Sequence, residues 1–223
     1  MNSPTTAREL EALFSGPVCC VELSGQGDES LLFPQEADAI RTAVARRRQE
    51  FASGRTCART ALSHLGVRRG PIPIGTDRAP MWPAGALGSI SHTGDYCVAV
   101  AGLTEDWSGL GIDAEIVAEV SPDLWRTVLC PSEIETLKAF GPAQGRRLAA
   151  VIFSAKEAFF KCQFPAARRW LDFTDVDVVP GDGDFVLRVR PEFAHPLAPN
   201  SASGRFILKD GLVITAVGVR NSC

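Results

Sequence analysis

The sequence predicts a mixed α/β (α+β) fold divided into two halves, and three observations support this. A long stretch with helical spacing precedes β-prone runs in the first half of the chain. The second half also places helical stretches ahead of a series of strand-like runs. Helices and strands do not alternate one by one, as a doubly wound parallel sheet would require. We place the division between residues 1–108 and 109–223, near the polar stretch between Gly102 and Gly109.

Length and composition exclude several classes of protein. The chain has 223 residues, of which 45% are hydrophobic, so it can bury a large core. Its net charge of −3 argues against a globally basic nucleic-acid binder. No apolar run reaches the roughly 20 residues that span a bilayer, and the N-terminus lacks the apolar core of a secretory signal. We therefore expect a cytoplasmic protein without a membrane or nucleic-acid partner.

In the first half, residues 34–66 have the spacing of one helix. Apolar positions recur at three- and four-residue intervals, Pro34 stands near the start and Gly66 at the end. Residues 68–88 are rich in proline and glycine and are predicted to be a loop. Residues 89–100 and 110–116 then read as two strands.

In the second half, residues 131–140 and 146–164 are predicted to be helical. The remaining chain contains four strand-like runs, at residues 176–179, 185–189, 206–208 and 212–219. Gly181 and Gly183 predict a turn between the first two of these runs.

The cysteines and histidines show no metal-binding pattern. The seven cysteines are odd in number and no pair has the C-x-x-C spacing of zinc or redox sites, so we expect free thiols, most of them buried. The sequence also lacks a P-loop, a dinucleotide fingerprint and a G-x-S-x-G nucleophile motif. Several common enzyme classes are thereby excluded.

Two carboxylates stand two residues apart in the strand-like run around Gly111-Ile-Asp113-Ala-Glu115. In a strand such residues point to the same side, where their like charges repel each other. A hard divalent cation such as Mg²⁺ would relieve this repulsion. A solvated strand end is the alternative that these five residues leave open.

A third carboxylate lies within a predicted helix, in Phe153-Ser-Ala-Lys156-Glu157-Ala-Phe-Phe-Lys161. At 100° per residue, Glu157 falls about 40° from Phe153, inside an apolar stripe. A buried carboxylate needs a partner. Lys161, one turn later, can pair with it, and a metal ion could also satisfy it.

Basic residues and one histidine form a further group of candidates. Arg48, Arg55 and Arg59 share one helical face, and Arg78 lies in the proline-rich loop. Arginine side chains match the geometry of phosphate. The Ser91-His92 pair follows a glycine at the start of a strand, where His92 could donate to a phosphate. Each feature alone is equally compatible with ordinary surface or core chemistry.

Taken together, these motifs resemble the 4′-phosphopantetheinyl transferases, in particular the monomeric two-half branch that serves polyketide, peptide and siderophore synthetases. The resemblance covers roughly residues 30–220. Its motifs are R-Q-E-F…R-T-C-A-R at 48–59, P-M-W-P at 80–83, S-H at 91–92, G-I-D-A-E at 111–115, F-S-A-K-E-A-F-F-K at 153–161, F-P…R-W-L-D-F at 164–173 and G-L-V-I-T-A at 211–216.

The resemblance implies two similar α/β halves in a pseudo-twofold arrangement, with coenzyme A as co-substrate in the cleft between them. It implies an Mg²⁺-dependent transfer of phosphopantetheine to a serine of an acyl or peptidyl carrier protein by a monomeric enzyme, with Mn²⁺ as a possible substitute. The implied metal ligands are Asp113, Glu115 and Glu157. The implied coenzyme A contacts are Arg48, Arg55, Arg78, Ser91, His92, Asp113, Lys156 and Lys161.

The resemblance also implies catalytic roles for Glu157, Lys156 and Lys161. The base that deprotonates the attacking serine is either Glu157 or a metal-bound water. Two rival hypotheses stay open: a metal-dependent phosphoesterase acting on coenzyme A or a nucleotide, and a non-catalytic binding subunit. The presence of all three carboxylates and both lysines disfavours the binding subunit. The carrier protein and its pathway are not determined by the sequence.

Overall fold

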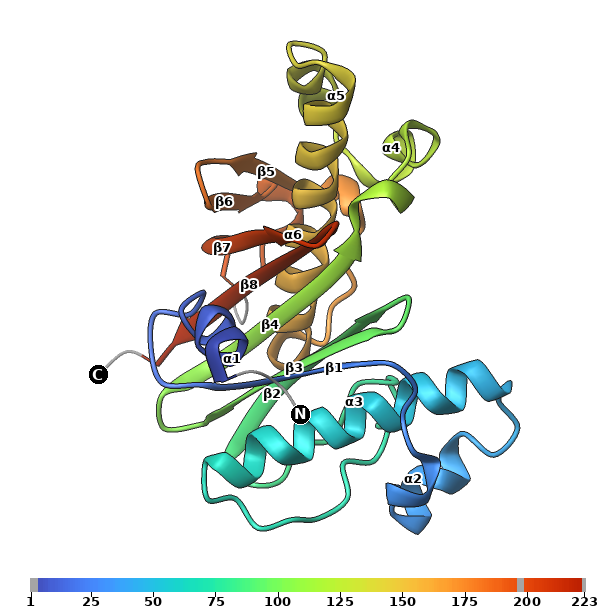
Figure 1. Ribbon diagram of the computed structural model, residues 1–223. Helices are drawn as coiled ribbons and strands as arrows, with labels where there is room; N and C mark the ends of the chain where they lie inside the picture. The colour runs from blue at the N-terminus through green and yellow to red at the C-terminus, as the bar shows by residue number, and fades with distance from the viewer. Residues whose placement is uncertain (1–3, 196–198, 222–223) are drawn as a thin grey trace.

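The computed structural model describes residues 4–195 and 199–221, which form two antiparallel sheets and the helices that cover them (Figure 1). The first sheet has the order β1-β3-β2 and the second the order β4-β8-β7-β6-β5. The mixed α/β prediction is confirmed. The strands are β1 Cys19–Ser24, β2 Ala86–Thr93, β3 Tyr96–Leu103, β4 Trp107–Ile116, β5 Val176–Pro180, β6 Asp184–Val189, β7 Ser201–Lys209 and β8 Leu212–Arg220.

Each sheet carries one long helix. The helix α3 packs on the first sheet and α6 packs on the second, where it lies across β4 and β8 (Figure 1). The α-helices are α1 Pro4–Glu11, α2 Pro34–Ala39, α3 Ala45–His64, α4 Pro122–Val128, α5 Pro131–Leu137 and α6 Pro142–Ala167. Short 3₁₀ turns are η1 Glu29–Leu31, η2 Val117–Glu119, η3 Phe173–Asp175 and η4 Pro191–Phe193.

The two sheets meet where β2 lies beside β4. These strands are not paired in a ladder but are joined through serine side chains of β2. The Ser89 hydroxyl donates to the carbonyl of Ile112 (3.4 Å), and the amide of Ala114 donates to the Ser91 hydroxyl (3.3 Å). We call this line of contact the seam.

Glycine in β4 allows α6 to lie directly on the second sheet. A Cβ atom at Gly111 would stand 1.8 Å from the carbonyl oxygen of Ala158, and one at Gly109 would stand 2.6 Å from that of Cys162. Any larger residue would push the helix away. This close approach brings the acidic end of β4 next to Glu157 and Lys161 on α6.

The core is shared by both halves of the chain. One buried cluster joins Leu10 of α1 and Val98 of β3 to Trp107 and Ile112 of β4 and Ala216 of β8. The Trp107 indole also donates to the carbonyl of Pro17 (2.7 Å). The division at residues 108 and 109 stays a prediction, and the two sides of it are packed against each other.

Two predicted elements of the first half are each divided in the structure. Residues 34–66 form two helices, α2 and α3, separated by a turn over residues 40–44. The turn lets Glu36 of α2 fold back onto the Arg59 guanidinium, which is buried with it (2.7 Å). Residues 89–100 form a hairpin rather than one strand, because the chain reverses at Gly94, whose φ of 57° suits glycine.

The helix α1, the strand β1 and the helix α4 were not predicted from the sequence. The predicted helices at 131–140 and 146–164 are present as α5 and α6, and the four predicted strands of the second half are β5 to β8. The cysteines among the described residues are free thiols, all buried apart from the partly exposed Cys19. Cys223 lies outside those residues. No helix in the described segments is long and apolar enough to cross a membrane.

Candidate active site

Asp113 is the centre of a hydrogen-bonded cluster at the seam. It is only 1% exposed. Its Oδ1 atom accepts from the Ser91 hydroxyl (2.9 Å) and from the Lys161 ammonium (2.6 Å), and its Oδ2 atom accepts from the Ser154 hydroxyl (2.7 Å). Ser154 in turn lies 2.9 Å from the hydroxyl of Thr215, which pairs with Asp113 in the sheet register. The carboxylate on β4 is therefore surrounded by side chains of β2, α6 and β8.

Ser91 was predicted to bind the cofactor, and the structure gives its hydroxyl another task. Besides donating to Asp113, it accepts from the Lys161 ammonium (3.1 Å) and from the backbone amide of Ala114. A serine hydroxyl has one donor and two acceptor positions, so these contacts use its full capacity. The hydroxyl thus orients Asp113, and the coenzyme A contact of Ser91 stays a prediction.

Lys161 pairs with Asp113 rather than with Glu157, which was the partner expected from helical spacing alone. Burial lowers the pKa of Lys161, but Asp113, Glu157 and Glu115 outweigh this effect, so its pKa is raised. Lys161 is therefore a permanent cation, about a quarter exposed, at the edge of the carboxylate group.

Glu115 and Glu157 border the same acidic site. Burial, together with the nearby Asp113 and Glu157 and despite Lys161, raises the pKa of Glu115 to about 8. Burial also raises the pKa of Glu157, and Asp113 adds to this effect while Lys161 opposes it. Three carboxylates thus share one ammonium group in a partly buried site. A divalent cation would offset the excess negative charge, so the donor set fits Mg²⁺ or Mn²⁺.

A different group has the tighter ligand spacing. Among the described residues, Cys130, Glu133 and Asp177 have donor atoms within 4.8 Å of one another, a criterion that the predicted trio does not meet. The ammonium of Lys156 already lies against Glu133, and burial raises the pKa of the Cys130 thiol to about 11. The Lys156 ammonium already balances the charge of Glu133, and the Cys130 thiol keeps its proton. This group is therefore unsuitable for a metal ion.

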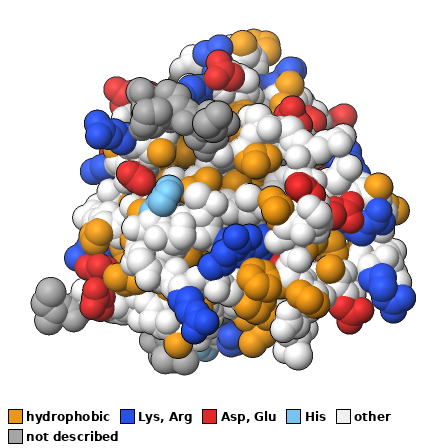
Figure 2. Space-filling model, turned by 60° about the horizontal axis from the view of Figure 1, so that its bottom comes forward, with side chains coloured by type: hydrophobic (Ala, Val, Ile, Leu, Met, Phe, Trp, Pro, Cys, Tyr) orange, Lys and Arg blue, Asp and Glu red, His pale blue; other side chains and the backbone are white. Residues whose placement is uncertain are grey.

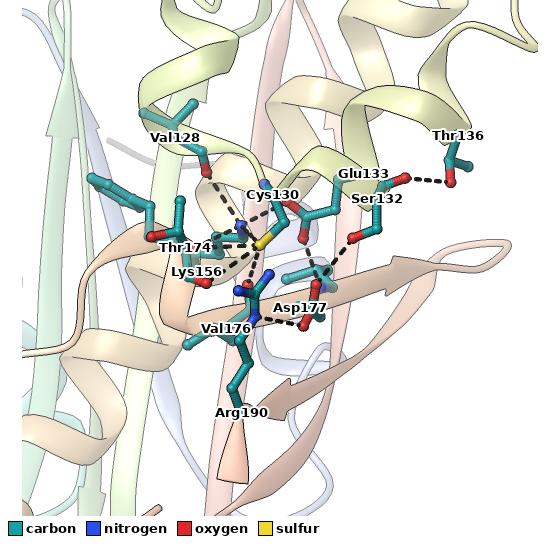
Figure 3. Close-up of polar contacts among 12 residues, drawn as sticks. Val128, Cys130, Ser132, Glu133, Thr136, Lys156, Thr174, Val176, Asp177 and Arg190 are labelled. Atoms are coloured by element: carbon teal, nitrogen blue, oxygen red, sulfur yellow. Dashed lines mark hydrogen bonds and ion pairs between the residues drawn. The ribbon is translucent and has the colours of Figure 1, made fainter. Parts of the chain in front are cut away.

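Lys156 lies in this second group and not at the seam (Figure 3). Its Nζ atom donates to Glu133 (2.7 Å) and to the carbonyls of Phe173 (2.8 Å) and Val128 (3.2 Å). The side chain is 2% exposed. The ammonium of Lys156 is thus paired within the protein, and its predicted phosphate contact and catalytic role stay predictions.

His92 follows Ser91 in β2 and lies beside Arg47 of α3. The Arg47 guanidinium donates to His92 Nε2 (2.7 Å), and Glu50 lies 3.6 Å from the same nitrogen. Arg48 contacts Glu29 (2.8 Å) and the carbonyl of Ala43. Adjacent residues of a helix point about 100° apart, so Arg47 and Arg48 have different partners, and the coenzyme A contacts of Arg48 and His92 stay predictions.

Arg55 and Arg78 remain candidates for binding anions. The Arg55 side chain is buried over the ring of Phe51, and its only hydrogen bond among the described residues is from Nε to the carbonyl of Ile72 (2.6 Å). Burial lowers its pKa to about 10. A buried guanidinium without a paired carboxylate is a suitable partner for phosphate. Arg78 is exposed in the proline-rich loop.

Two cavities adjoin the carboxylate group and share Phe160 and Trp170 as lining residues. The larger, about 370 Å³, lies between the proline-rich loop, β2 and the end of α6, and includes Arg78 and Lys161. The smaller, about 120 Å³, includes the charged residues Lys156, Glu157 and Asp172, and its other lining residues are aromatic or aliphatic. Figure 2 shows basic side chains beside hydrophobic ones on the face that is lowest in Figure 1.

Sequence reasoning missed Ser154, Thr215, Arg47 and Glu50. Ser154 lies inside the F-S-A-K-E motif and Glu50 inside R-Q-E-F, so both stood within patterns already singled out. Thr215 lies inside the G-L-V-I-T-A motif, but its contact with Ser154 beside Asp113 depends on the register between β4 and β8, which the motif does not give.

Comparison with known proteins agrees with this site. The model of the 4′-phosphopantetheinyl transferase N-terminal domain matches residues 35–102, and that of the 4′-phosphopantetheinyl transferase superfamily matches residues 109–212. The second match contains all three carboxylates and both motif lysines.

Three curated relatives are similar over most of the chain. The 4′-phosphopantetheinyl transferase Svp of Streptomyces mobaraensis is 36% identical, over 85% of this chain and 79% of the relative. PptT of Mycobacterium tuberculosis is 35% identical, over 82% and 84%. Npt of Nocardia iowensis is 31% identical, over 93% and 98%. The chain belongs to the 4′-phosphopantetheinyl transferase superfamily.

Proposed function

We propose that this enzyme transfers 4′-phosphopantetheine from coenzyme A to a serine hydroxyl of an acyl or peptidyl carrier protein, releasing 3′,5′-ADP, in an Mg²⁺-dependent reaction. The single observation that carries the proposal is the seam, where three carboxylates and Lys161 adjoin two cavities of different character. Family membership supports the reaction type.

Coenzyme A has an anionic nucleotide end, a pyrophosphate and a long uncharged pantetheine arm. The site has a surface suited to each of these three parts. Basic residues Arg47, Arg55 and Arg78 and the His92 ring suit the nucleotide phosphate, and the larger cavity has room for the nucleotide. Lys161, and the cation that the carboxylates would hold, suit the negatively charged pyrophosphate. The smaller, largely apolar cavity starts at Glu157 and suits the arm.

In the reaction, the serine oxygen attacks the phosphorus that bears the pantetheine arm, and the bond to 3′,5′-ADP breaks. Asp113, Glu115 and Glu157 would hold Mg²⁺, which supplies charge neutralisation for the pyrophosphate when bound. The Lys161 ammonium would donate to a phosphate oxygen as charge develops there. A base at the site would accept the serine proton.

The base would be either Glu157 or a water molecule held by the cation. Glu157 lines the smaller cavity, but it would also be one of the ligands of the cation, which would lower its basicity. We further propose that the enzyme acts as a monomer in the cytoplasm.

The test is the intact mass of apo carrier proteins after incubation with the enzyme, coenzyme A and Mg²⁺. We expect a gain of one phosphopantetheine, which is lost when EDTA replaces Mg²⁺. Hydrolysis of coenzyme A without modification of any carrier type would overturn the proposal in favour of a phosphoesterase. Binding of coenzyme A without any chemistry would overturn it in favour of a binding subunit.

A further inference from the structure

A buried ion pair lies on the side of α6 that faces away from the seam. Lys156 and Glu133 are 2% and 4% exposed in their side chains, and their charged atoms are 2.7 Å apart. Glu133 also accepts from the amides of Cys130 (2.6 Å) and Val178 (2.8 Å). Every strong contact of this pair is therefore inside the protein, where removing one charge leaves the other uncompensated.

The pair fixes the segment of chain that follows α6. The Lys156 ammonium donates to the carbonyl of Phe173 (2.8 Å), at the start of η3. The Cys130 thiol lies against the carbonyls of Thr174 and Val176 on the same segment (Figure 3). Glu133 holds the next strand through Val178. Residues 173–176 are thus held against α5 and α6 by one polar cluster, directly after Trp170 and Leu171.

This segment forms a wall of the smaller cavity. Trp170, Leu171 and Phe173 line that cavity together with Lys156, Glu157 and Phe160 of α6. Lys156 and Glu157 are adjacent on the helix and so point about 100° apart. Lys156 lies where α6 meets the wall and donates to the carbonyl of Phe173, whereas Glu157 borders the carboxylate group.

We propose that Lys156 and Glu133 are positioning residues: their ion pair holds the wall of residues 170–173 in place and so sets the width of the cavity that receives the pantetheine arm. The inference rests on the proposed function, because it assigns the smaller cavity to that arm. It gives the lysine of the K-E motif a role different from the phosphate contact that the family resemblance implied.

The test is a double-mutant cycle with Lys156→Met and Glu133→Gln. Two affinities are measured for each variant: that for coenzyme A, which has the arm, and that for 3′,5′-ADP, which lacks it. We expect each single substitution to raise the Kd of coenzyme A about tenfold, with the Kd of 3′,5′-ADP changed less than twofold. The double variant should bind coenzyme A no more weakly than the weaker single variant. The KM for coenzyme A should rise with these affinities while kcat falls less.

The exposed Lys138 and Glu135 pair on and beside α5 provides a matched control. Lys138→Met with Glu135→Gln should change neither affinity. Near-ultraviolet circular dichroism shows whether each variant folds. If a single variant does not fold, the two affinities of the double variant, which lacks both charges, are compared with those of the wild type.

A different pattern would overturn the inference. Loss of 3′,5′-ADP affinity in Lys156→Met, with normal binding in Glu133→Gln, would assign Lys156 to direct phosphate contact. An equal loss of both ligands in all folded variants would assign the pair to general structure. If the wild-type enzyme itself neither bound coenzyme A nor modified a carrier, the proposed function would fail instead.

Discussion

Asp113 receives hydrogen bonds from three side chains on two different elements, β2 and α6, which leaves its carboxylate in one orientation. Such fixed geometry is typical of groups that must hold a cation in a defined position. Lys161 balances the charge of Asp113, and the negative charge of Glu157, together with that of Glu115 once it has lost its proton, requires a cation from outside. Asp113 is thus held in a fixed position at the centre of the carboxylate group.

Replacing Asp113 with asparagine should abolish Mg²⁺ binding and lower transfer by more than about 100-fold, because the amide is neutral and leaves Lys161 without its partner. Titration calorimetry with Mg²⁺ and the carrier mass assay measure the two effects. Asp177→Asn is the control, since Asp177 belongs to the other acidic group and pairs with Arg190. Equal loss of Mg²⁺ binding in both variants would contradict the assignment.

Mg²⁺ affinity should depend on pH through Glu115. Its pKa of about 8 in the metal-free protein means that the carboxyl is protonated at neutral pH and must lose its proton when the cation binds. Affinity should therefore rise between pH 6.5 and 8.5 by up to about tenfold per unit and level off above that range. Calorimetry in buffers of different ionisation enthalpy measures the released proton. A pH-independent affinity would contradict this account.

The same shift predicts how pH changes stability. The folded, metal-free protein retains a proton on Glu115 that the unfolded chain has lost above its usual pKa of 4.5. The unfolded state is thus favoured progressively as pH rises from 4.5 towards 8. Added Mg²⁺ should raise the Tm more at pH 8 than at pH 6.

At the residue scale, the sequence was sufficient to nominate Asp113, Glu115, Glu157, Lys161 and His92. It could not separate Lys156 from Lys161 or Arg47 from Arg48, because a motif records residue types and not the direction in which each side chain points. In both cases the rotation of about 100° per residue along a helix gives the two cationic side chains different directions and therefore different partners.

At the scale of elements, the contact of α6 with β4 determines the site. Gly111 has no room for a side chain because the backbone of Ala158 lies against it, and this contact places Lys161 within 2.6 Å of Asp113. The glycine of G-I-D-x-E is therefore required for close packing rather than for a turn.

Gly111→Ala should destabilise the protein by about 2–3 kcal/mol through overpacking and should lower transfer, since α6 must move away from β4. Urea unfolding and the carrier mass assay measure these effects. Gly141→Ala is the matched control: Gly141 precedes the same helix with a φ of −65°, and a Cβ there meets nothing within 4 Å. Similar losses in both variants would show that the contact with Ala158 is unimportant.

Most helices and strands were predictable because their apolar periodicity is clear, as in α6 and β8. The division of residues 34–66 was not, because it results from the ion pair of Glu36 with Arg59, which lie 23 positions apart. The hairpin at Gly94 was likewise missed, since only β3 is apolar throughout, whereas β2 carries several polar residues and gave no strand pattern of its own.

At the scale of the whole molecule, the two sheets depend on one another. The core cluster around Trp107 takes side chains from α1, β3, β4 and β8 and so crosses the predicted division. The sequence predicted two halves, but the extent of their common core follows from contacts between residues more than 100 positions apart. No local pattern carries that information.

Unfolding in urea should therefore occur in one cooperative transition, with the same midpoint by tryptophan fluorescence and by far-ultraviolet circular dichroism. Residues 1–108 expressed alone should not give the dispersed amide spectrum of a folded domain, because Leu110, Ile112 and Ala216 are missing from their core. Two separate transitions, or a folded fragment, would show that the halves are independent.

The central claim is that a divalent cation binds between the two halves at the seam, where the phosphates of coenzyme A also lie. The most direct measurement is anomalous scattering from crystals of the enzyme grown with Mn²⁺ and coenzyme A. The account predicts one strong peak among Asp113, Glu115 and Glu157, next to the pyrophosphate. A peak among Cys130, Glu133 and Asp177, or none in crystals that contain coenzyme A, would contradict it.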